Sequence, residues 1–163
     1  MTTEYTLTYF DARGSGETIR LILAYVGAKW KEVRIPFDEN TGAIIPEDIK
    51  TKMLFDQAPL LEFEGRRLVQ SLAISRFLAR RYNLAGKDEY ESAECDQIVD
   101  ACRDIYVMFV AFFREKDETK RKEGMETTTK TCKDRYFSKF NEILQKNGDF
   151  LVNNNFTTGP PSG

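Results

Sequence analysis

Glu4-Tyr-Thr-Leu-Thr-Tyr-Phe-Asp-Ala-Arg-Gly-Ser-Gly-Glu-Thr-Ile-Arg20 is the stretch that decides the fold. Residues 5–9 alternate with a period of two and are rich in β-formers, which predicts a half-buried strand. Residues 11–16 read as a turn. The next segment reads as a helix that ends at Gly27. Its apolar stripe holds Ile19, Ile22, Leu23 and Val26. Because residues 30–35 read as a second strand, we expect a right-handed β-α-β unit with parallel strands.

A β-hairpin is predicted farther along the chain, after a short helix-like stretch over residues 47–52. Residues 59–63 and 66–69 flank Glu64-Gly65, which is the spacing of a two-residue hairpin turn. Ser71 then opens a helix whose apolar face holds Ile74, Phe77, Leu78 and Tyr82. The resulting order, β-α-β-α-β-β-α, is the thioredoxin-like topology.

The second half of the chain is predicted to be helical. One long helix is marked by Ile98, Ala101, Cys102, Ile105, Met108, Phe109 and Phe112. Another, ending at Asn147-Gly148, is marked by Cys132, Tyr136, Phe140, Ile143 and Leu144. The charged run Lys116–Glu123 reads as a solvated junction between them. We therefore expect an α/β domain over residues 1–83, a linker over 84–88, an all-α domain over 89–152 and a disordered tail over 153–163.

Composition excludes several classes of function. The chain has 163 residues with 24 Lys+Arg against 26 Asp+Glu, so we expect no nucleic-acid binding through a basic field. Histidine is absent, which excludes His-based triads and most zinc or iron sites, and we expect no metal. The longest nearly apolar run, 106–113, is far shorter than the about 20 residues of a membrane span. The chain has three cysteines without a CxxC pair and no secretory signal, which predicts a cytoplasmic protein. We expect Cys95 and Cys102 to be small core residues.

The first turn is the most informative candidate site. A strand end, a glycine turn and a helix N-terminus place side chains and free backbone N–H groups close together, where one ligand can contact them all. Tyr9 stands there, and its phenol can donate a hydrogen bond to an anion, which favours the charged form of that partner. The other interpretation is a tyrosine whose ring lies in the core, and the pattern alone favours it.

Three further positions offer contacts to a ligand, each with a plainer interpretation. Ala58-Pro59 begins a strand, and a cis bond there would turn the Ala58 backbone toward an extended peptide, although base rates favour a trans proline. Ser71 is a natural N-cap after Gln70, so this helix end either holds a carboxylate or is simply capped. Lys50 either pairs with a second carboxylate or is solvated.

Three motifs in this order resemble the cytosolic glutathione S-transferases. They are Leu7-Thr-Tyr-Phe-Asp-Ala-Arg-Gly-Ser-Gly-Glu-Thr-Ile-Arg20, Ala58-Pro-Leu-Leu-Glu62 and Gln70-Ser-Leu-Ala-Ile-Ser-Arg-Phe-Leu-Ala-Arg80. The resemblance runs from residue 4 to residue 152 and points to sigma-class and nematode-type enzymes related to glutathione-dependent prostaglandin D synthase. It implies a thioredoxin-like domain joined to an all-α domain, glutathione as co-substrate without a prosthetic group, and a homodimer.

The resemblance also implies a role for each candidate residue. Tyr9 would hydrogen-bond the glutathione sulfur, and Ala58, before Pro59, would pair with the cysteinyl backbone. Gln70 and Ser71 would hold the γ-glutamyl carboxylate, and Asp104 of the partner subunit would approach the amine. The remaining contacts would be Lys50 and Gln57 at the glycyl end, with Phe10, Ala12 and Tyr106 lining the pocket for a small hydrophobic electrophile.

The sequence departs from the family at three places. Ser15 stands where an arginine or another long residue is usual, and Pro46 where a tryptophan is usual, so we expect weaker binding of the glycyl carboxylate. After residue 152 the family continues with further helices, so the chain looks truncated and its all-α domain incomplete. Two functions stay open: a detoxifying glutathione transferase, with prostaglandin isomerase or peroxidase side activity, or a non-catalytic ligand-binding or structural protein of the same fold. Thiol–disulfide exchange is disfavoured because residues 9–16 hold no cysteine.

Overall fold

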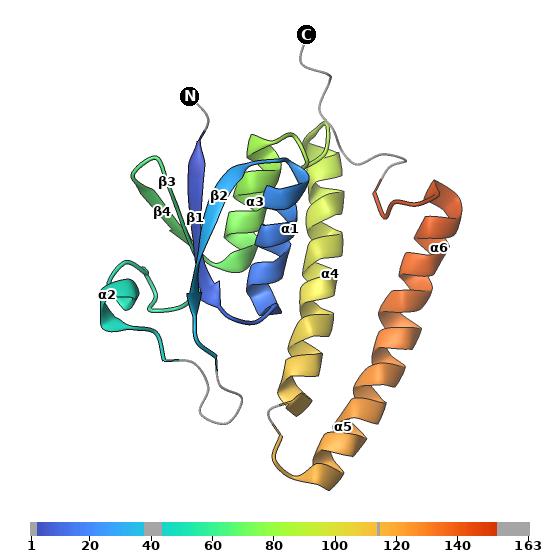
Figure 1. Ribbon diagram of the computed structural model, residues 1–163. Coiled ribbons are helices and arrows are strands. Elements are labelled where there is room, and N and C mark those ends of the chain that lie inside the picture. Colours follow the sequence, from blue (N-terminus) through green and yellow to red (C-terminus); the bar gives the residue numbers. More distant parts are fainter. Residues whose placement is uncertain (1–2, 38–43, 114, 153–163) are drawn as a thin grey trace. The chain divides into compact units, whose positions relative to one another are not determined.

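The computed structural model describes residues 3–37, 44–113 and 115–152. The chain divides into two compact units, the first ending at Tyr82 and the second beginning at Asn83 (Figure 1). The tail expected to be disordered, residues 153–163, lies outside the described residues.

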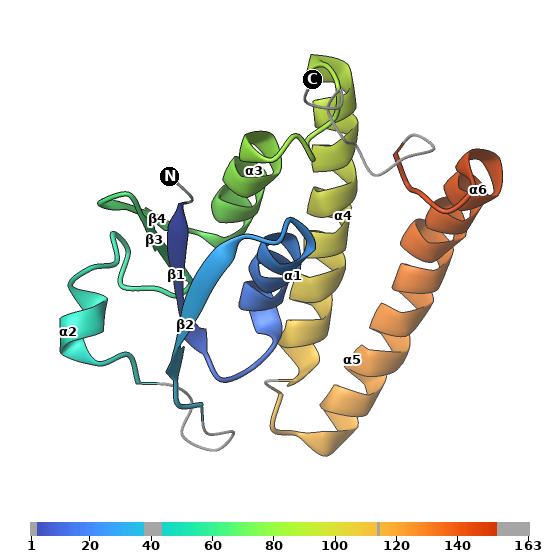
Figure 2. The same cartoon turned by 45° about the horizontal axis from the view of Figure 1, so that its top comes forward.

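The first unit is a four-stranded sheet with helices on both faces. Its elements are β1 (Glu4–Phe10), the 3-10 turn η1 (Gly14–Gly16), α1 (Glu17–Tyr25), β2 (Lys29–Ile35), α2 (Glu47–Lys50), β3 (Leu60–Phe63), β4 (Arg66–Val69) and α3 (Ser71–Arg81). The strand order is β2-β1-β3-β4, with β1 and β2 parallel and the other two pairs antiparallel. Figures 1 and 2 show α1 and α3 side by side on one face and α2 beyond the other. This is the expected thioredoxin-like fold.

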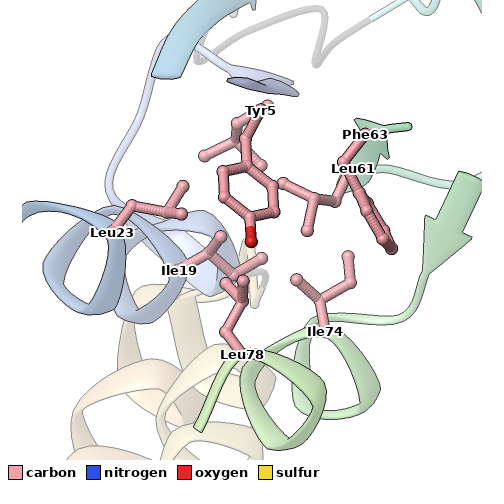
Figure 3. Packing of buried hydrophobic residues seen from close by; sticks show 8 residues of the cluster. Tyr5, Ile19, Leu23, Leu61, Phe63, Ile74 and Leu78 are labelled. Carbon is pink, nitrogen blue, oxygen red and sulfur yellow. The ribbon is translucent and has the colours of Figure 1, made fainter. Parts of the chain in front are cut away.

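Alternate residues of β1 anchor the strand in a core on each face of the sheet. Tyr5 and Leu7 are fully buried on the face that α1 and α3 cover. Figure 3 shows the Tyr5 ring surrounded by side chains of α1, β3 and α3, namely Ile19, Leu23, Leu61, Phe63, Ile74 and Leu78. A smaller cluster on the opposite face holds Ile35, Met53, Leu60 and Val69, with Phe10 packed against it. The carboxyl end of β1 is therefore fixed from both sides.

The turns of this unit lie at the predicted residues. Glu64 and Gly65 have φ values of 49° and 70°, the left-handed conformation that a tight two-residue hairpin requires. Gly27, with φ of 61°, follows the end of α1. The predicted helix over 47–52 is shorter than expected, because α2 ends at Lys50.

The second unit contains α4 (Glu89–Phe113), α5 (Glu118–Thr131), a π-helical segment η2 (Cys132–Phe137) and α6 (Ser138–Asn147). The end at Asn147 is confirmed, with Gly148 at φ of 78°. The predicted junction over Lys116–Glu123 is wrong, because α5 begins at Glu118 and runs through it. The Asp117 side chain caps α5 by accepting a hydrogen bond from the Lys120 N–H at 3.0 Å. None of the described helices is long and apolar enough to cross a membrane.

The cysteines of this unit differ in exposure. Cys132 is fully buried, Cys95 is half-buried, and Cys102 is exposed, so the expectation of a core position is wrong for Cys102. Burial, assisted by neighbouring carboxylates such as Asp96, raises the pKa of the Cys95 thiol. A raised pKa keeps that thiol protonated and unreactive at neutral pH.

Candidate functional site

Tyr9 is fixed at the end of β1 by the turn that follows it. Its ring centroid lies 5.1 Å from that of Phe10, and its hydroxyl accepts a hydrogen bond from the Ser15 backbone N–H at 2.9 Å. The side chain is only 6% exposed, as the core interpretation expects. Within the part of the chain that the structure describes, no group accepts the hydroxyl proton. A phenol in this arrangement can still donate its proton to a ligand.

Two glycines allow the turn to pack directly on the Tyr9 ring. A Cβ added at Gly14 would lie 2.5 Å from the Tyr9 hydroxyl oxygen, and one at Gly16 would lie 2.5 Å from ring atom Cδ1. Gly14 also has φ of 41°, which residues with side chains rarely adopt. The absence of side chains at these positions is what brings the Ser15 N–H to the hydroxyl.

Arg20 of α1 holds the same turn from the other side. Its guanidinium lies 2.8 Å from the Glu17 carboxylate and 2.7 Å from the Glu32 carboxylate. It also donates hydrogen bonds to backbone carbonyls of the turn, those of Phe10, Ala12 and Arg13. Arg20 is not among the predicted site residues. The available signal is a single cation within the otherwise apolar stretch 19–25 of α1, together with an acidic residue, Glu32, on β2.

The segment before β3 carries the second group of predicted contacts. The Ala58–Pro59 peptide bond is cis, as the resemblance implies and against the base-rate expectation of a trans bond. Pro59 is buried, Ala58 is half-buried and Gln57 is exposed. The Lys50 ammonium is 3.9 Å from the Asp56 carboxylate, and 41% of its side chain is exposed, so this cation is loosely paired.

Gln70 and Ser71 begin α3. The prediction that Ser71 is the N-cap is wrong, because Gln70 occupies that position and its carbonyl accepts the first helical bond, from the Ile74 N–H at 2.9 Å. The Gln70 side chain makes no capping hydrogen bond, and its backbone has φ of 72° and ψ of 110°. Such a backbone is strained for a residue with a side chain and is frequent at ligand-binding positions. The first N–H groups of α3 have no partner within the helix and can receive an anion.

Asp104 and Tyr106 lie on α4, in the second unit, and both are exposed. The Asp104 carboxylate accepts a hydrogen bond from the Tyr136 hydroxyl at 3.3 Å. The Arg103 guanidinium lies 5.0 Å from the centroid of the Tyr106 ring. The structure therefore brings Tyr9, Phe10 and Ala12 together at one turn, whereas the roles of Asp104 and Tyr106 stay predictions.

Comparison with known proteins decides the family. The model of the glutathione S-transferase N-terminal domain matches residues 5–80, and that of the C-terminal domain matches residues 103–159. Glutathione S-transferase 2 of Manduca sexta is 36% identical over 144 residues, which are 88% of this chain and 68% of that protein. This chain belongs to the glutathione S-transferase family. The family uses glutathione as its co-substrate.

Other relatives of this chain come from vertebrates and insects. Glutathione S-transferase alpha-4 of Rattus norvegicus is 36% identical over 150 residues, 91% of this chain and 65% of that protein. The solved structure of prostaglandin synthase D of Nilaparvata lugens matches with a TM-score of 0.80 and 34% identity, covering 93% of this chain and 73% of that one. The chain thus spans about two thirds of the length of the curated relatives from Rattus norvegicus and Manduca sexta, 65% and 68%.

Proposed function

We propose that this chain binds reduced glutathione at the β1–α1 turn and activates its thiol as a thiolate for conjugation to small hydrophobic electrophiles. The observation that carries the proposal is the Tyr9 hydroxyl, which accepts the Ser15 N–H at 2.9 Å and keeps its own proton for a further bond. Because an accepted hydrogen bond polarises a hydroxyl, it strengthens the bond that the hydroxyl donates. A glutathione sulfur atom beside this turn would accept the hydrogen bond that the Tyr9 hydroxyl donates.

The magnitude of one such hydrogen bond is sufficient for the chemistry. A free thiol has a pKa of about 8.5 and is mostly protonated at neutral pH. A hydrogen bond to a charged group contributes about 1.5–3 kcal/mol, and one pKa unit corresponds to about 1.4 kcal/mol. Donation by Tyr9 to the thiolate alone would therefore lower the pKa of the thiol by about one to two units. The thiolate attacks the electrophile directly, so no covalent enzyme intermediate is needed.

Both carboxylates and the cysteinyl backbone of the tripeptide would find partners in the same unit as Tyr9. The strained Gln70 backbone and the open N–H groups of α3 suit the γ-glutamyl carboxylate, with Ser71 beside them. Ala58, before the cis Pro59, would pair with the cysteinyl backbone, while Lys50 and Gln57 would bind the glycyl end. A homodimer would supply Asp104 of the partner subunit to the γ-glutamyl amine.

The electrophile is proposed to lie against Phe10, Ala12 and Tyr106. Phe10 and Ala12 lie at the same turn as Tyr9, since the Ala12 N–H donates to the Phe10 carbonyl at 2.7 Å. Holding the electrophile next to the thiolate would supply the rest of the rate enhancement through orientation. Detoxification in the cytoplasm, with prostaglandin isomerase or peroxidase side activity, is the corresponding role.

A second candidate is a non-catalytic ligand-binding or structural protein of the same fold. The low exposure of Tyr9, 6%, favours it, because a thiol must reach the hydroxyl for activation. The two candidates differ in turnover, because only the first activates the thiol.

The test compares wild type with Tyr9→Phe in the conjugation of glutathione to an aryl halide. We expect a large fall in turnover with little change in the calorimetric affinity for glutathione, because only the donor to sulfur is removed. Tyr90→Phe, at a tyrosine that is 74% exposed on α4, is the matched control and should behave as wild type. Equal turnover in wild type and Tyr9→Phe would contradict the proposal. Binding of glutathione by wild type without any turnover would support the second candidate.

A further inference from the structure

We infer that Arg20 is a positioning residue, whose clamp on the turn of residues 11–17 holds the Tyr9 hydroxyl where it can donate to the glutathione sulfur. The inference rests on the proposed function of Tyr9. Arg20 contacts the turn and lies over the Tyr9 ring, so it would act through Tyr9.

The turn needs such a clamp because its own conformation is weakly determined. Gly14 and Gly16 lack side chains, and glycine has more backbone freedom to lose than any other residue. Asp11, Arg13 and Gly14 are all exposed, so burial does little to fix the first part of this segment, although Gly16 at its end is buried. The Ser15 N–H nevertheless has to stay within hydrogen-bonding distance of the Tyr9 hydroxyl.

Arg20 ties together the two ends of the turn. At the start it donates to the Ala12 carbonyl at 2.9 Å and to the Phe10 carbonyl at 3.3 Å. At the far end it pairs with Glu17, the first residue of α1. Its side chain is 12% exposed, and its Cζ lies 5.6 Å from the centroid of the Tyr9 ring. One planar guanidinium therefore sets the separation of the turn's ends and covers the ring between them.

Two charged residues of β2, Glu32 and Arg34, extend the network around the Arg20 guanidinium. One oxygen of Glu32 binds Arg20 at 2.7 Å, and the other accepts from Arg34 at 3.0 Å. Arg34 closes the network by binding Asp11, the first residue of the turn, at 2.5 Å. The charges alternate in sign from Glu17 to Asp11, so each member has an oppositely charged neighbour.

A positioning role of Arg20 and a role of its positive charge alone predict different behaviour for Arg20→Lys. A lysine keeps the positive charge near the ring, but its compact ammonium lacks the planar fork of five N–H donors. It cannot reach two carboxylates and the carbonyls of Phe10, Ala12 and Arg13 at once. If positioning is the role, the lysine variant must lose function although the charge remains.

The experiment compares full-length Arg20→Lys with Arg81→Lys. Arg81 is a matched control, because it also pairs with a carboxylate, that of Glu64, and lies 5.5 Å from an aromatic centroid, that of Phe63. Two readouts are measured: hydrogen exchange of the Ser15 amide without ligand, and the pH dependence of glutathione conjugation. The first does not depend on activity.

We expect faster Ser15 exchange in Arg20→Lys alone, because its amide bond to Tyr9 opens more often. We also expect kcat to fall about tenfold, less than the hundredfold that a 1 Å displacement can cost, and the pH midpoint to rise, with KM for glutathione nearly unchanged. Ser15 exchange equal in the two variants would overturn the inference, as would faster exchange with unchanged kcat and pH midpoint. If wild type shows no turnover, the proposed function fails, and the exchange measurement alone decides whether Arg20 positions the turn.

Discussion

Replacement of Gly14 by alanine tests how tightly the turn positions the Tyr9 hydroxyl. The added Cβ would lie 2.5 Å from the hydroxyl oxygen and 3.3 Å from ring atom Cζ. Carbon and oxygen atoms in weak contact are normally separated by about 3.3–3.6 Å, so the hydroxyl and the turn must move apart by about 1 Å. A displacement of this size can lower catalytic efficiency by about a hundredfold. The backbone conformation, with φ of 41°, adds strain of about 1–2 kcal/mol.

Gly65→Ala separates the two effects of this substitution. Gly65 has φ of 70°, so alanine there is strained in the same way, yet nothing lies within 4 Å of the added Cβ. Thermal unfolding and steady-state conjugation of glutathione to an aryl halide are measured for both variants. We expect both to lose stability, by about 1–2 kcal/mol from strain, and only Gly14→Ala to lose most of its turnover. Similar turnover in the two variants would refute the claim that the turn sets the position of the hydroxyl.

Two further predictions concern stability. Arg81 donates a hydrogen bond to Glu64 and lowers the pKa of the Glu64 carboxyl. The pair therefore stabilises the fold fully above the ordinary pKa of glutamate. This stabilisation is lost as the pH falls through the lowered pKa. The Tm of Glu64→Gln should therefore fall less steeply than that of wild type below pH about 4, and parallel curves would contradict the assignment. Asp117→Ala should destabilise α5 by about 1 kcal/mol, seen as a lower urea midpoint by circular dichroism, because the Lys120 N–H loses its cap. An unchanged midpoint would show that the cap contributes nothing.

The elements with a strong local signal could be predicted from sequence. The alternation over residues 5–9 and the Glu64-Gly65 spacing determine β1 and the hairpin, because side-chain period and turn geometry leave few alternatives. The helix that contains Lys116–Glu123 could not be predicted from apolar spacing, since α5 has no apolar stripe. Its start depends on the Asp117 cap and on residues with good helix propensity, such as lysine and glutamate.

The candidate site was predictable only where a motif names the residue. The strand-to-helix turn marks Tyr9 as a candidate donor, whereas its contact with a glutathione sulfur and the cis Ala58–Pro59 bond follow only from the family resemblance. The positive φ of Gln70 has no sequence signal, because nothing but tertiary structure forces a non-glycine residue into that region. Arg20 escapes prediction for a related reason: its contacts come from β2, the turn and α1, which only the folded chain brings together.

The pKa of the thiol in bound glutathione tests the central claim most directly. Thiolate absorbs in the ultraviolet and thiol does not, so a pH titration of the complex reports the ionised fraction at the sulfur itself. With Tyr9 as the donor, wild type should show a midpoint about one to two units below the 8.5 of a free thiol, and Tyr9→Phe should return it toward that value. The same midpoint in both complexes would contradict the assignment of Tyr9 as the group that stabilises the thiolate.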